Sequence, residues 1–495
     1  MPEFSEDRPG FLLYKREDIP LRPVNERIKD WKEIYRRLPE EKVRIQSERC
    51  MGCGVPFCHY GCPLGNHTPI VNRYYREGKI REAIDLLHTT NNFPEFTGLL
   101  CPALCEKSCV LGLNDNPVTI RQIELSVAEK AWEMGMVEPL PPVEELDKRV
   151  AVIGSGPSGL TVAQQLRRAG YRVTVFERAD KPGGFLRYGI PDFKLEKHYL
   201  DRRLVQLEKE GVVFRNSINV GVDYDAIDLK KDFDAIVLAC GSNKPRDLNI
   251  PGRDLKGIYF AAEFLSHANK VVSGKAKENP ALSAKNKNVI VIGGGDTGND
   301  CVSTAIRQGC KSVIQFELFP PPPESRPSDK PWPQFVRTLS KSISIEEGGV
   351  QVFRINTKRF IGNKKGEVIS LVASRVTVVE EHGKPKLEEI PNSEMEFPAD
   401  LVILALGFAG AEESNLIGKL GLKLTPWGTV RVDEKGMTSV EGIFGTGDMV
   451  RGQSLIVWAI AEGRKVAHYV DRYLRGETEL PNPLADYYVK SPFEI

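Results

Sequence analysis

From Arg149 onward, short apolar runs of strand length alternate with stretches whose apolar residues recur at helical spacing. Two of these runs, within Phe233–Gly241 and Ala399–Gly407, have the length and composition of buried strands. Strands that alternate with amphipathic helices usually form a parallel sheet covered by those helices. The pattern therefore predicts an α/β fold for this part of the chain.

The first 148 residues follow a different pattern. Residues 1–40 are charged and contain several prolines, and helical spacing of apolar residues within them predicts a helix over Val24–Leu38. The predicted apolar face of that helix carries Ile28, Trp31, Ile34 and Tyr35. Residues 41–135 contain the helix-like stretch Pro69–Thr89, and proline density predicts an extended linker over 136–148.

An internal repeat is the main clue to the architecture. Val150–Glu177 and Val289–Glu317 share one order: apolar strand, glycine-rich turn, helix, second strand, acidic residue. Two nucleotide-binding folds of the Rossmann type are therefore predicted. The segment after Gly407 contains TSVEGIFGTGD and an amphipathic helix, which indicates a return to the first fold. The expected domains are 149–280 with 402–475, then 281–401 inserted between them, then a tail over 476–495.

The first glycine motif is Gly154-x-Gly156-x-x-Gly159, and Glu177 follows at the expected distance. Such a turn brings a pyrophosphate to a helix N-terminus, and the acidic residue accepts from ribose hydroxyls. Two later glycine-containing segments favour FAD, with Asp448 expected at the ribityl hydroxyls unless it only caps a helix. The candidate FAD residues are Gly154, Gly156, Ser158, Gly159, Glu177, Gly183, Gly184, Arg187, Gly447, Asp448, Gln453 and Ser454.

The second glycine motif begins at Gly293 and is expected to hold NAD(P)H. Glu317 ends its second strand, and a carboxylate there favours NADH because it accepts from a free 2′-OH and repels a 2′-phosphate. Arg326 and Lys330 lie in the loop that follows and are alternative phosphate partners. The candidate NAD(P)H residues are Gly293, Gly295, Asp296, Thr297, Gly298, Glu317 and Arg326.

Seven of the ten cysteines fall between Cys50 and Cys109, in the motifs C-x2-C-x4-C-x3-C-P and C-P-x2-C-x3-C. Dense cysteines followed by proline are typical of iron–sulfur ligation. A structural zinc site is the alternative from a different class, since C-x2-C pairs also bind zinc. The other three cysteines, Cys240, Cys301 and Cys310, are expected to be small buried apolar residues.

Charge and hydropathy narrow the class of protein further. Lys and Arg total 68 against 67 for Asp and Glu, which gives no electrostatic reason to expect nucleic acid or an anionic membrane as a partner. No apolar run reaches the ~18 residues of a membrane span, and the N-terminus lacks a signal-peptide pattern. Ten cysteines without such a signal predict a reducing, cytoplasmic location.

These motifs together resemble the small (β) subunit of bacterial glutamate synthase. The resemblance rests on NNFPEFTGLLCPALCEKSC, GSGPSGL, RYGIPDFKLEK, VIGGGDTGNDC and GTGDMVRGQSLIVWAIAEGRKVA, and it spans essentially the whole chain. It implies FAD, NAD(P)H, two 4Fe–4S clusters, no acid–base catalytic side chain, and a large FMN-containing subunit in a hetero-oligomer. Related modules serve dihydropyrimidine dehydrogenases and NADH-dependent ferredoxin:NADP oxidoreductases, so those partners stay open.

The resemblance also implies which residues hold each cluster, because related enzymes cross the two cysteine groups. One set would be Cys50, Cys53, Cys58 and Cys109. The other would be Cys62, Cys101, Cys105 and Glu124, with the carboxylate as the non-cysteine ligand. The alternative for Glu124 is a solvated carboxylate on a helix face.

Overall fold

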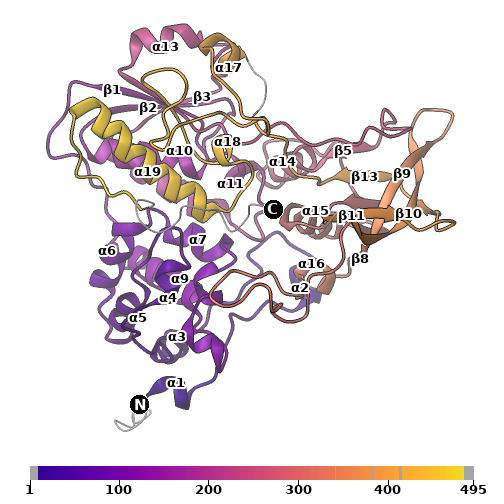
Figure 1. The fold of residues 1–495 in the computed structure, drawn as a ribbon, viewed down its shortest axis with the longest axis horizontal. Helices are drawn as coiled ribbons and strands as arrows, with labels where there is room; N and C mark the ends of the chain where they lie inside the picture. The colour runs from indigo at the N-terminus through magenta and orange to yellow at the C-terminus, as the bar shows by residue number, and fades with distance from the viewer. Residues whose placement is uncertain (1–8, 341, 382–383, 412–414, 484–495) are drawn as a thin grey trace.

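The structure, a computed structural model, describes residues 9–340, 342–381, 384–411 and 415–483. Three bodies are visible in Figure 1: a helical cysteine domain, a first α/β domain above it, and a second α/β domain beside both. The predicted fold class is confirmed, because each α/β domain is built on a five-stranded sheet whose strand pairs are all parallel. The parts of the predicted extension and tail over 1–8 and 484–495 lie outside the described residues.

The helical cysteine domain consists of short helices packed around one apolar core. The predicted helical stretch Pro69–Thr89 forms two helices, separated at Gly78, whose φ of +73° a side chain would strain. The helices of this domain are α3 (Glu40–Glu48), α4 (Phe57–Tyr60), α5 (Thr68–Arg76), α6 (Ile80–Thr90), α7 (Pro94–Leu100), α8 (Leu104–Lys107), the 3₁₀ turn Val110–Leu113 and α9 (Ile120–Glu133).

The first α/β domain has the strand order β14-β4-β1-β2-β3. Its strands are β1 (Arg149–Ile153), β2 (Arg172–Glu177), β3 (Val213–Asn216), β4 (Ala235–Leu238) and β14 (Ile443–Gly445). Its helices are α10 (Pro157–Arg168), α11 (Phe185–Tyr188), α12 (Lys197–Glu210), α13 (Ala226–Asp232), α17 (Asn415–Leu420), α18 (Asp448–Arg451) and α19 (Ile456–Arg475). The predicted return of the chain to this domain is visible in β14, which pairs with β4.

The second α/β domain repeats this order as β5-β13-β6-β7-β8. Its strands are β5 (Ile258–Phe260), β6 (Asn288–Ile292), β7 (Ser312–Glu317), β8 (Val350–Phe353) and β13 (Leu401–Leu404), and its helices are α14 (Ala261–Val272), α15 (Asp296–Arg307) and α16 (Ile343–Glu346). Between β8 and β13 the chain forms an antiparallel sheet that sequence patterning did not predict. It contains β9 (Ile355–Gly362), β10 (Val368–Glu381), β11 (Lys384–Glu389) and β12 (Met395–Pro398).

Strand pairing differs from the expected limits between the two α/β domains. Strand β5 precedes residue 281, yet it pairs with β13 in the second sheet. Strand β13 also extends past residue 401, and the following strand of the first sheet is β14. The sheet pairing therefore favours a crossing before Ile258 and a return after Leu404, while the remaining boundaries stay predictions.

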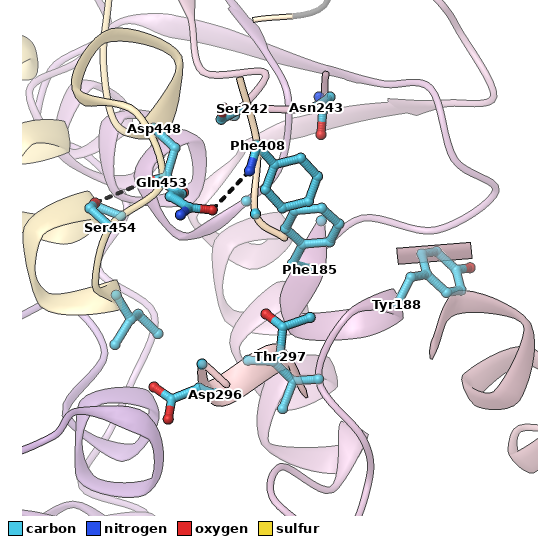
Figure 2. A pocket seen from close by; sticks show the side chains of 18 of the residues that line it. Phe185, Tyr188, Ser242, Asn243, Asp296, Thr297, Phe408, Asp448, Gln453 and Ser454 are labelled. Atoms are coloured by element: carbon cyan, nitrogen blue, oxygen red, sulfur yellow. Dashed lines mark hydrogen bonds between the residues drawn. The ribbon is translucent and has the colours of Figure 1, made fainter. Parts of the chain in front are cut away.

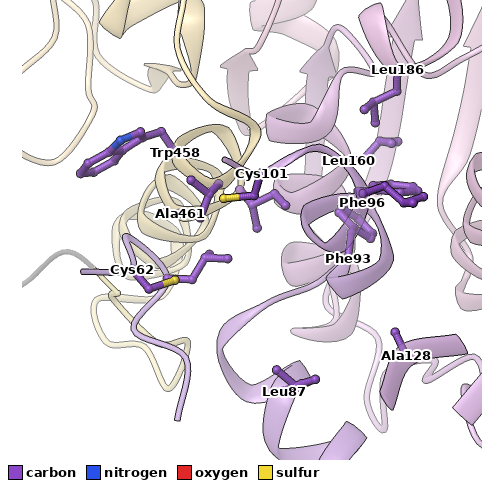
Figure 3. Close-up of a cluster of buried hydrophobic side chains, with 14 of the residues drawn as sticks. Cys62, Leu87, Phe93, Phe96, Cys101, Ala128, Leu160, Leu186, Trp458 and Ala461 are labelled. Carbon is purple, nitrogen blue, oxygen red and sulfur yellow. The ribbon is translucent and has the colours of Figure 1, made fainter. Parts of the chain in front are cut away.

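The helical cysteine domain and the first α/β domain share one hydrophobic core. Figure 3 shows Cys62 and Cys101 near Trp458 and Ala461 of α19, with Leu160 of α10 in the same cluster. Apolar area removed from water stabilises folding by about 25 cal/mol per Å². A continuous core therefore fixes the cysteines relative to the first sheet more firmly than a linker alone.

The helix predicted over Val24–Leu38 is wrong beyond its first turn, because α2 (Val24–Arg27) ends there. The following backbone pairs with other segments instead of with itself: Ile34 N–H donates to Phe193 O at 3.0 Å, and Ile34 O accepts from Arg22 N–H at 2.8 Å. Backbone groups satisfied in this way do not need a helix. The apolar pattern still predicted burial correctly at Ile34, which is fully buried.

A buried ion pair also joins the helical cysteine domain to the first α/β domain. Arg203 on α12 donates from Nε and Nη2 to the two carboxylate oxygens of Glu95 on α7, at 2.5 and 2.7 Å. Both side chains are almost fully buried, and the guanidinium also lies 4.9 Å from the ring centre of Trp132. Removal of one partner of such a pair leaves the other as an uncompensated buried charge.

We expect Glu95→Ala to lower the free energy of unfolding by about 3–5 kcal/mol, because it leaves Arg203 charged and unpaired in the interior. Urea unfolding followed by tryptophan fluorescence measures this, since Trp132 lies beside Arg203. Glu26→Ala is the control: Glu26 pairs with Arg36 at the surface, and its loss should cost no more than about 1 kcal/mol. Equal effects of the two substitutions would contradict this account of the interface.

Candidate functional site

A cavity of about 1440 Å³ lies where the three domains meet. Its walls include both glycine turns, the start of α19, and the segment Leu99–Pro102 of the helical cysteine domain. A cavity of this size exceeds the ~300–1,000 Å³ typical of a small-ligand site, so it has room for more than one group. The structure thus brings the two sequence repeats and one cysteine group to a single space.

The first glycine turn has the shape that a bound pyrophosphate requires. Gly154 has φ of +103°, and a Cβ there would lie 2.5 Å from Ala239 O. At Gly159 a Cβ would lie 2.1 Å from Gly154 O, so the helix packs directly on the turn. At Gly156, by contrast, a Cβ would meet nothing within 4 Å, and no side chain caps α10. The free N–H groups at this helix start therefore face open space suited to an anion.

The second glycine turn repeats this geometry residue by residue. A Cβ at Gly293 would lie 2.2 Å from Ala405 O, and one at Gly298 would lie 2.2 Å from Gly293 O. A Cβ at Gly295 would again meet nothing within 4 Å, and α15 also has no side-chain cap. Asp296 and Thr297 at the start of α15 line the cavity, as Figure 2 shows. Both turns therefore fit a dinucleotide.

Glu177 and Glu317 close the second strand of each repeat and line the cavity. The Glu177 carboxylate accepts from the Ser155 hydroxyl and from Ala179 N–H at 2.8 Å. The Glu317 carboxylate lies directly against Gly294, where a Cβ would meet it. Each carboxylate thus stands beside its glycine turn, where the ribose hydroxyls of a dinucleotide would donate hydrogen bonds to it.

The predicted FAD residues that precede α19, namely Asp448, Gln453 and Ser454, also line the cavity. Ser454 Oγ donates to Asp448 Oδ1 at 2.8 Å, and Gln453 Oε1 accepts from Phe408 N–H at 3.0 Å. Burial raises the pKa of Asp448 to about 6, while the Ser454 hydrogen bond opposes that shift. In Figure 2 the rings of Phe185 and Phe408 lie side by side near these residues, tilted by 31° with centres 5.6 Å apart.

Two predicted arginines do not line the cavity. Arg187 donates to Pro182 O and to Asp201, and Arg326 donates to the carbonyls of Lys330 and Gln334 at 3.0 and 2.7 Å. Their binding roles stay predictions, and these contacts favour a loop-ordering role for Arg326. The glycines Gly159, Gly183, Gly298 and Gly447 act through backbone packing, since neighbouring atoms would clash with a side chain at each.

Sequence reasoning missed several residues that line the cavity. They were not singled out as site residues and include Tyr35, Pro102, Arg121, Lys194 and Asn243. Lys194 forms an ion pair with Asp300 of α15; the lysine is partly buried and the aspartate is buried. A single lysine gives no periodic signal, so only the three-dimensional structure brings it to the cavity.

The seven clustered cysteines separate into two groups in space. Cys50, Cys53, Cys58 and Cys109 border one small hollow. Burial raises the pKa of Cys58 to about 12, and the neighbouring Cys109, Cys50 and Cys53 add to that rise. None of the seven is paired in a disulfide. This grouping matches the first predicted ligand set.

The second group surrounds Glu124, which lies on α9. Burial, with Glu124 as the next cause, raises the pKa of Cys62 to about 12, and Cys101 and Cys105 also have Glu124 among their charged neighbours. Burial raises the pKa of Glu124 itself to about 7, and Asn66 Nδ2 contacts both of its oxygens at 3.1 Å. Glu124 is buried, so it is not a solvated carboxylate on a helix face.

The donor chemistry of both groups fits an iron–sulfur cluster. Buried thiolates and a buried carboxylate are costly as isolated anions, and bound metal supplies the missing positive charge. Within the described ranges, no group of three or more His, Cys, Asp or Glu is spaced to hold a single metal ion.

Among the same described residues, no helix is both long and apolar enough to cross a membrane.

Comparison with known families agrees with this site. Residues 148–463 match the family model "Pyridine nucleotide-disulphide oxidoreductase", and residues 27–136 match "Dihydropyrimidine dehydrogenase domain II, 4Fe-4S cluster". The fold and site therefore define an NAD(P)H-dependent flavin oxidoreductase with a 4Fe–4S domain.

Relatives over the full length narrow this class. The chain is 52% identical, over 97% of its length and 98% of the relative's, to glutamate synthase (NADPH) small chain of Mycobacterium tuberculosis. It is 43% identical to the same-named protein of Bacillus subtilis, over 95% of its length and 99% of that protein's. It is also 46% identical to glutamate synthase (NADH) of Schizosaccharomyces pombe, covering 95% of this chain and 23% of that protein. The chain belongs to the glutamate synthase small-chain family.

Solved structures support the fold alone. The structure of M. tuberculosis FprA in complex with NADPH superposes with a TM-score of 0.55 at 19% identity. The superposition covers 66% of this chain and 85% of that one.

We expect Glu124→Ala to reduce bound iron from about eight to about four atoms per chain, because one of two four-iron sets loses a ligand. Iron and sulfide analysis after anaerobic purification measures this. Glu133→Ala is the matched control, since Glu133 ends the same helix at the surface. Four irons in the unsubstituted protein, or eight in the Glu124 variant, would contradict the second ligand set.

The raised pKa of Asp448 predicts a pH effect on the flavin-free protein. Because the folded-state pKa of about 6 exceeds the ordinary 3.8, the stabilising contribution of the protonated carboxyl is present below about pH 4 and is lost as pH rises through 6. Asp448 is only partly buried, so we expect about 1–2 kcal/mol. The free energies of unfolding of the wild type and Asp448→Asn should therefore diverge as the pH rises from about 4 to about 6. A constant difference between the two proteins over this range would show that burial does not raise the pKa of Asp448.

Proposed function

We propose that this chain is the electron-input subunit of a glutamate synthase. In this proposal it oxidises NAD(P)H and passes electrons to a large subunit, which contains FMN and makes glutamate from 2-oxoglutarate and glutamine. The two chains would form a hetero-oligomer in the cytoplasm. The observation that carries the proposal is the shared cavity, which both glycine turns and the Cys101–Pro102 corner line together.

The residues present divide the work of binding between the two α/β domains. FAD bound at the first turn would accept a hydride from NAD(P)H and release electrons singly to 4Fe–4S clusters. The Gly156 turn and the start of α10 would bind the FAD pyrophosphate, and Asp448 would orient the ribityl chain. The Gly295 turn and α15 would bind the coenzyme on the facing wall. Apolar groups such as Phe185 and Phe408 would exclude water from the space between them.

The two cysteine groups differ in their distance from the cavity and from solvent. Cys101 lines the cavity, and it belongs with the buried Cys62 and Cys105. Cys50 and Cys53 are only partly buried. This arrangement supports an inner cluster beside the flavin and an outer cluster nearer the surface, where an acceptor protein can approach.

The relatives support a large partner rather than another acceptor. Relatives named "small chain" imply a large chain, and the S. pombe relative is a protein of which this chain matches only 23%. The family model named for dihydropyrimidine dehydrogenase matches residues 27–136, whereas the relatives that match nearly the whole chain are named glutamate synthase. The glutamate synthase partner is therefore favoured over a pyrimidine-reducing or transhydrogenase partner.

Affinity purification of the tagged chain from its native host, under anaerobic conditions, tests the partner. We expect a glutamate synthase large chain to copurify in a fixed ratio, with FMN in addition to FAD. Copurification of a pyrimidine-reducing enzyme instead would overturn the proposal. A colourless preparation that contains zinc would support the structural zinc alternative.

Two glycine substitutions separate the roles of the turns. Gly156→Val and Gly295→Val each place a side chain in open space, so both proteins should fold. The first should contain no flavin, because the side chain occupies the pyrophosphate position. The second should retain flavin but lose its reduction by NAD(P)H. Flavin absorbance and anaerobic reduction measure both; the reverse phenotypes would exchange the two site assignments.

Coenzyme choice depends on Glu317. Its charge against Gly294 favours NADH, and repulsion of a 2′-phosphate would weaken NADPH binding by about tenfold or more. The names of relatives include both NADPH and NADH. We expect Glu317→Ala to improve NADPH binding relative to NADH, with Glu324→Ala, in the exposed loop, as the control. Stronger binding of NADPH by the unsubstituted protein, weakened by Arg326→Ala, would contradict the argument.

A further inference from the structure

The segment Pro9–Pro39, here called the N-terminal strap, contacts all three domains. At its start Arg16 forms an ion pair with Glu106 of the helical cysteine domain at 2.8 Å. In the same region Arg49, which is fully buried, donates to Tyr14 O at 3.0 Å. These contacts anchor the strap to the domain that holds the cysteines.

The middle of the strap packs on the first α/β domain at Phe193. Ile34 N–H donates to Phe193 O at 3.0 Å, and the ring of Trp31 lies 6.2 Å from that of Phe193. Farther along, Tyr199 on α12 donates its hydroxyl to Glu33 at 3.0 Å. Ile34 and Phe193 are both fully buried, so this contact is a small apolar core of its own.

The strap reaches the second α/β domain through a buried charge network. Arg27 Nε donates to Glu347 Oε1 at 2.9 Å, and Arg27 Nη2 donates to Glu346 at 3.1 Å. Arg307, at the end of α15, donates to both oxygens of Glu347 at 2.6 and 3.0 Å. It also donates from Nε to Asp30 O of the strap at 3.2 Å. Figure 1 shows α2 beside α16 at this junction.

The network is electrically matched and almost dry. The side chains of Arg307 and Glu347 are fully buried, and that of Arg27 is 2% exposed. Burial opposes ionisation of Glu347, yet hydrogen bonds from Arg307, Ser303 and Arg27 outweigh it and lower its pKa below the ordinary value. Arg307 also lies 3.9 Å over the ring of Phe193. The strap, the first α/β domain and the second therefore meet at one point.

This junction lies at the far end of the helix that begins at the second glycine turn. Helix α15 runs from Asp296, which lines the cavity, to Arg307 in the network. Between them, Asp300 pairs with Lys194, the residue after Phe193. Tyr35 of the strap lines the cavity itself. Any rotation of the second α/β domain would have to break the strap contacts and the Lys194 pair together.

We propose that the N-terminal strap fixes the orientation of the second α/β domain relative to the first, and that Arg27 is a positioning residue for hydride transfer. Arg27 does not line the cavity; it acts through Glu347, which follows α16, and through Arg307 on α15, the helix that begins at the coenzyme turn. This inference rests on the proposed function, because it concerns the distance between NAD(P)H and FAD.

Arg27→Ala in the full-length holoprotein tests the proposal. We expect the limiting rate of flavin reduction at saturating NAD(P)H to fall by about tenfold, since small misplacements of reacting groups have effects of that size or larger. The dissociation constant of the coenzyme should change by less than about twofold, because the Gly295 turn is untouched. The Arg307–Glu347 pair remains in this variant, so the second domain keeps its own fold. Arg27→Lys should restore part of the rate.

Arg36→Ala is the matched control, because Arg36 lies in the same strap but is 54% exposed and pairs only with Glu26 at the surface. Amide hydrogen exchange without coenzyme gives a second readout: Arg27→Ala should accelerate exchange at residues 190–197 and 343–349, and Arg36→Ala should not. Unchanged exchange there, or a limiting rate within twofold of the wild type, would overturn the proposal. Failure of the wild type to be reduced by either coenzyme would instead contradict the proposed function. In that case the hydrogen-exchange comparison would still test whether the strap fixes the orientation of the second α/β domain.

Discussion

The contact between the helical cysteine domain and the first α/β domain is the constraint on which the rest of the structure depends. Electrons pass between protein-bound groups only if those groups stay close, so the Cys101–Pro102 corner must remain at the wall of the cofactor cavity. A shared hydrophobic core and the buried Arg203–Glu95 pair hold it there. The charges of Arg203 and Glu95 are paired, and the buried Arg464 of α19 donates to Asn92 Oδ1 and to Thr89 O across the same interface.

The two α/β domains have the same type of binding turn, and both turns face one cavity. Each presents a glycine turn whose middle glycine opens on the cavity and whose outer glycines pack against backbone carbonyls. Their sheets have equivalent strand orders, so both turns stand at the carboxyl ends of parallel strands, where such folds bind ligands. Since the turns belong to separate domains, domain orientation sets the distance between the two ligands. The N-terminal strap spans this joint, together with the Lys194–Asp300 pair.

Local patterns predicted much of this arrangement. Period and glycine spacing were sufficient for both repeats, and cysteine spacing indicated the iron–sulfur class, because these signals depend on neighbours in sequence. The strap was not predictable in this way: Ile34 pairs its backbone with Arg22 and Phe193, which overrides helical spacing. Lys194 and Tyr35 line the cavity, although no local pattern assigned either of them to the site. The grouping of Glu124 with Cys62, Cys101 and Cys105 came from a family resemblance and is consistent with their proximity.

The most direct test of the account is the coupling of coenzyme oxidation to glutamate formation. The purified chain is combined anaerobically with the glutamate synthase large chain of the same organism, and NAD(P)H consumption is compared with glutamate produced. The account predicts that oxidation requires both glutamine and 2-oxoglutarate and that Cys101→Ala abolishes glutamate formation while leaving FAD bound. Glutamate formation by the Cys101 variant at the wild-type rate would contradict a route through the inner cysteine group.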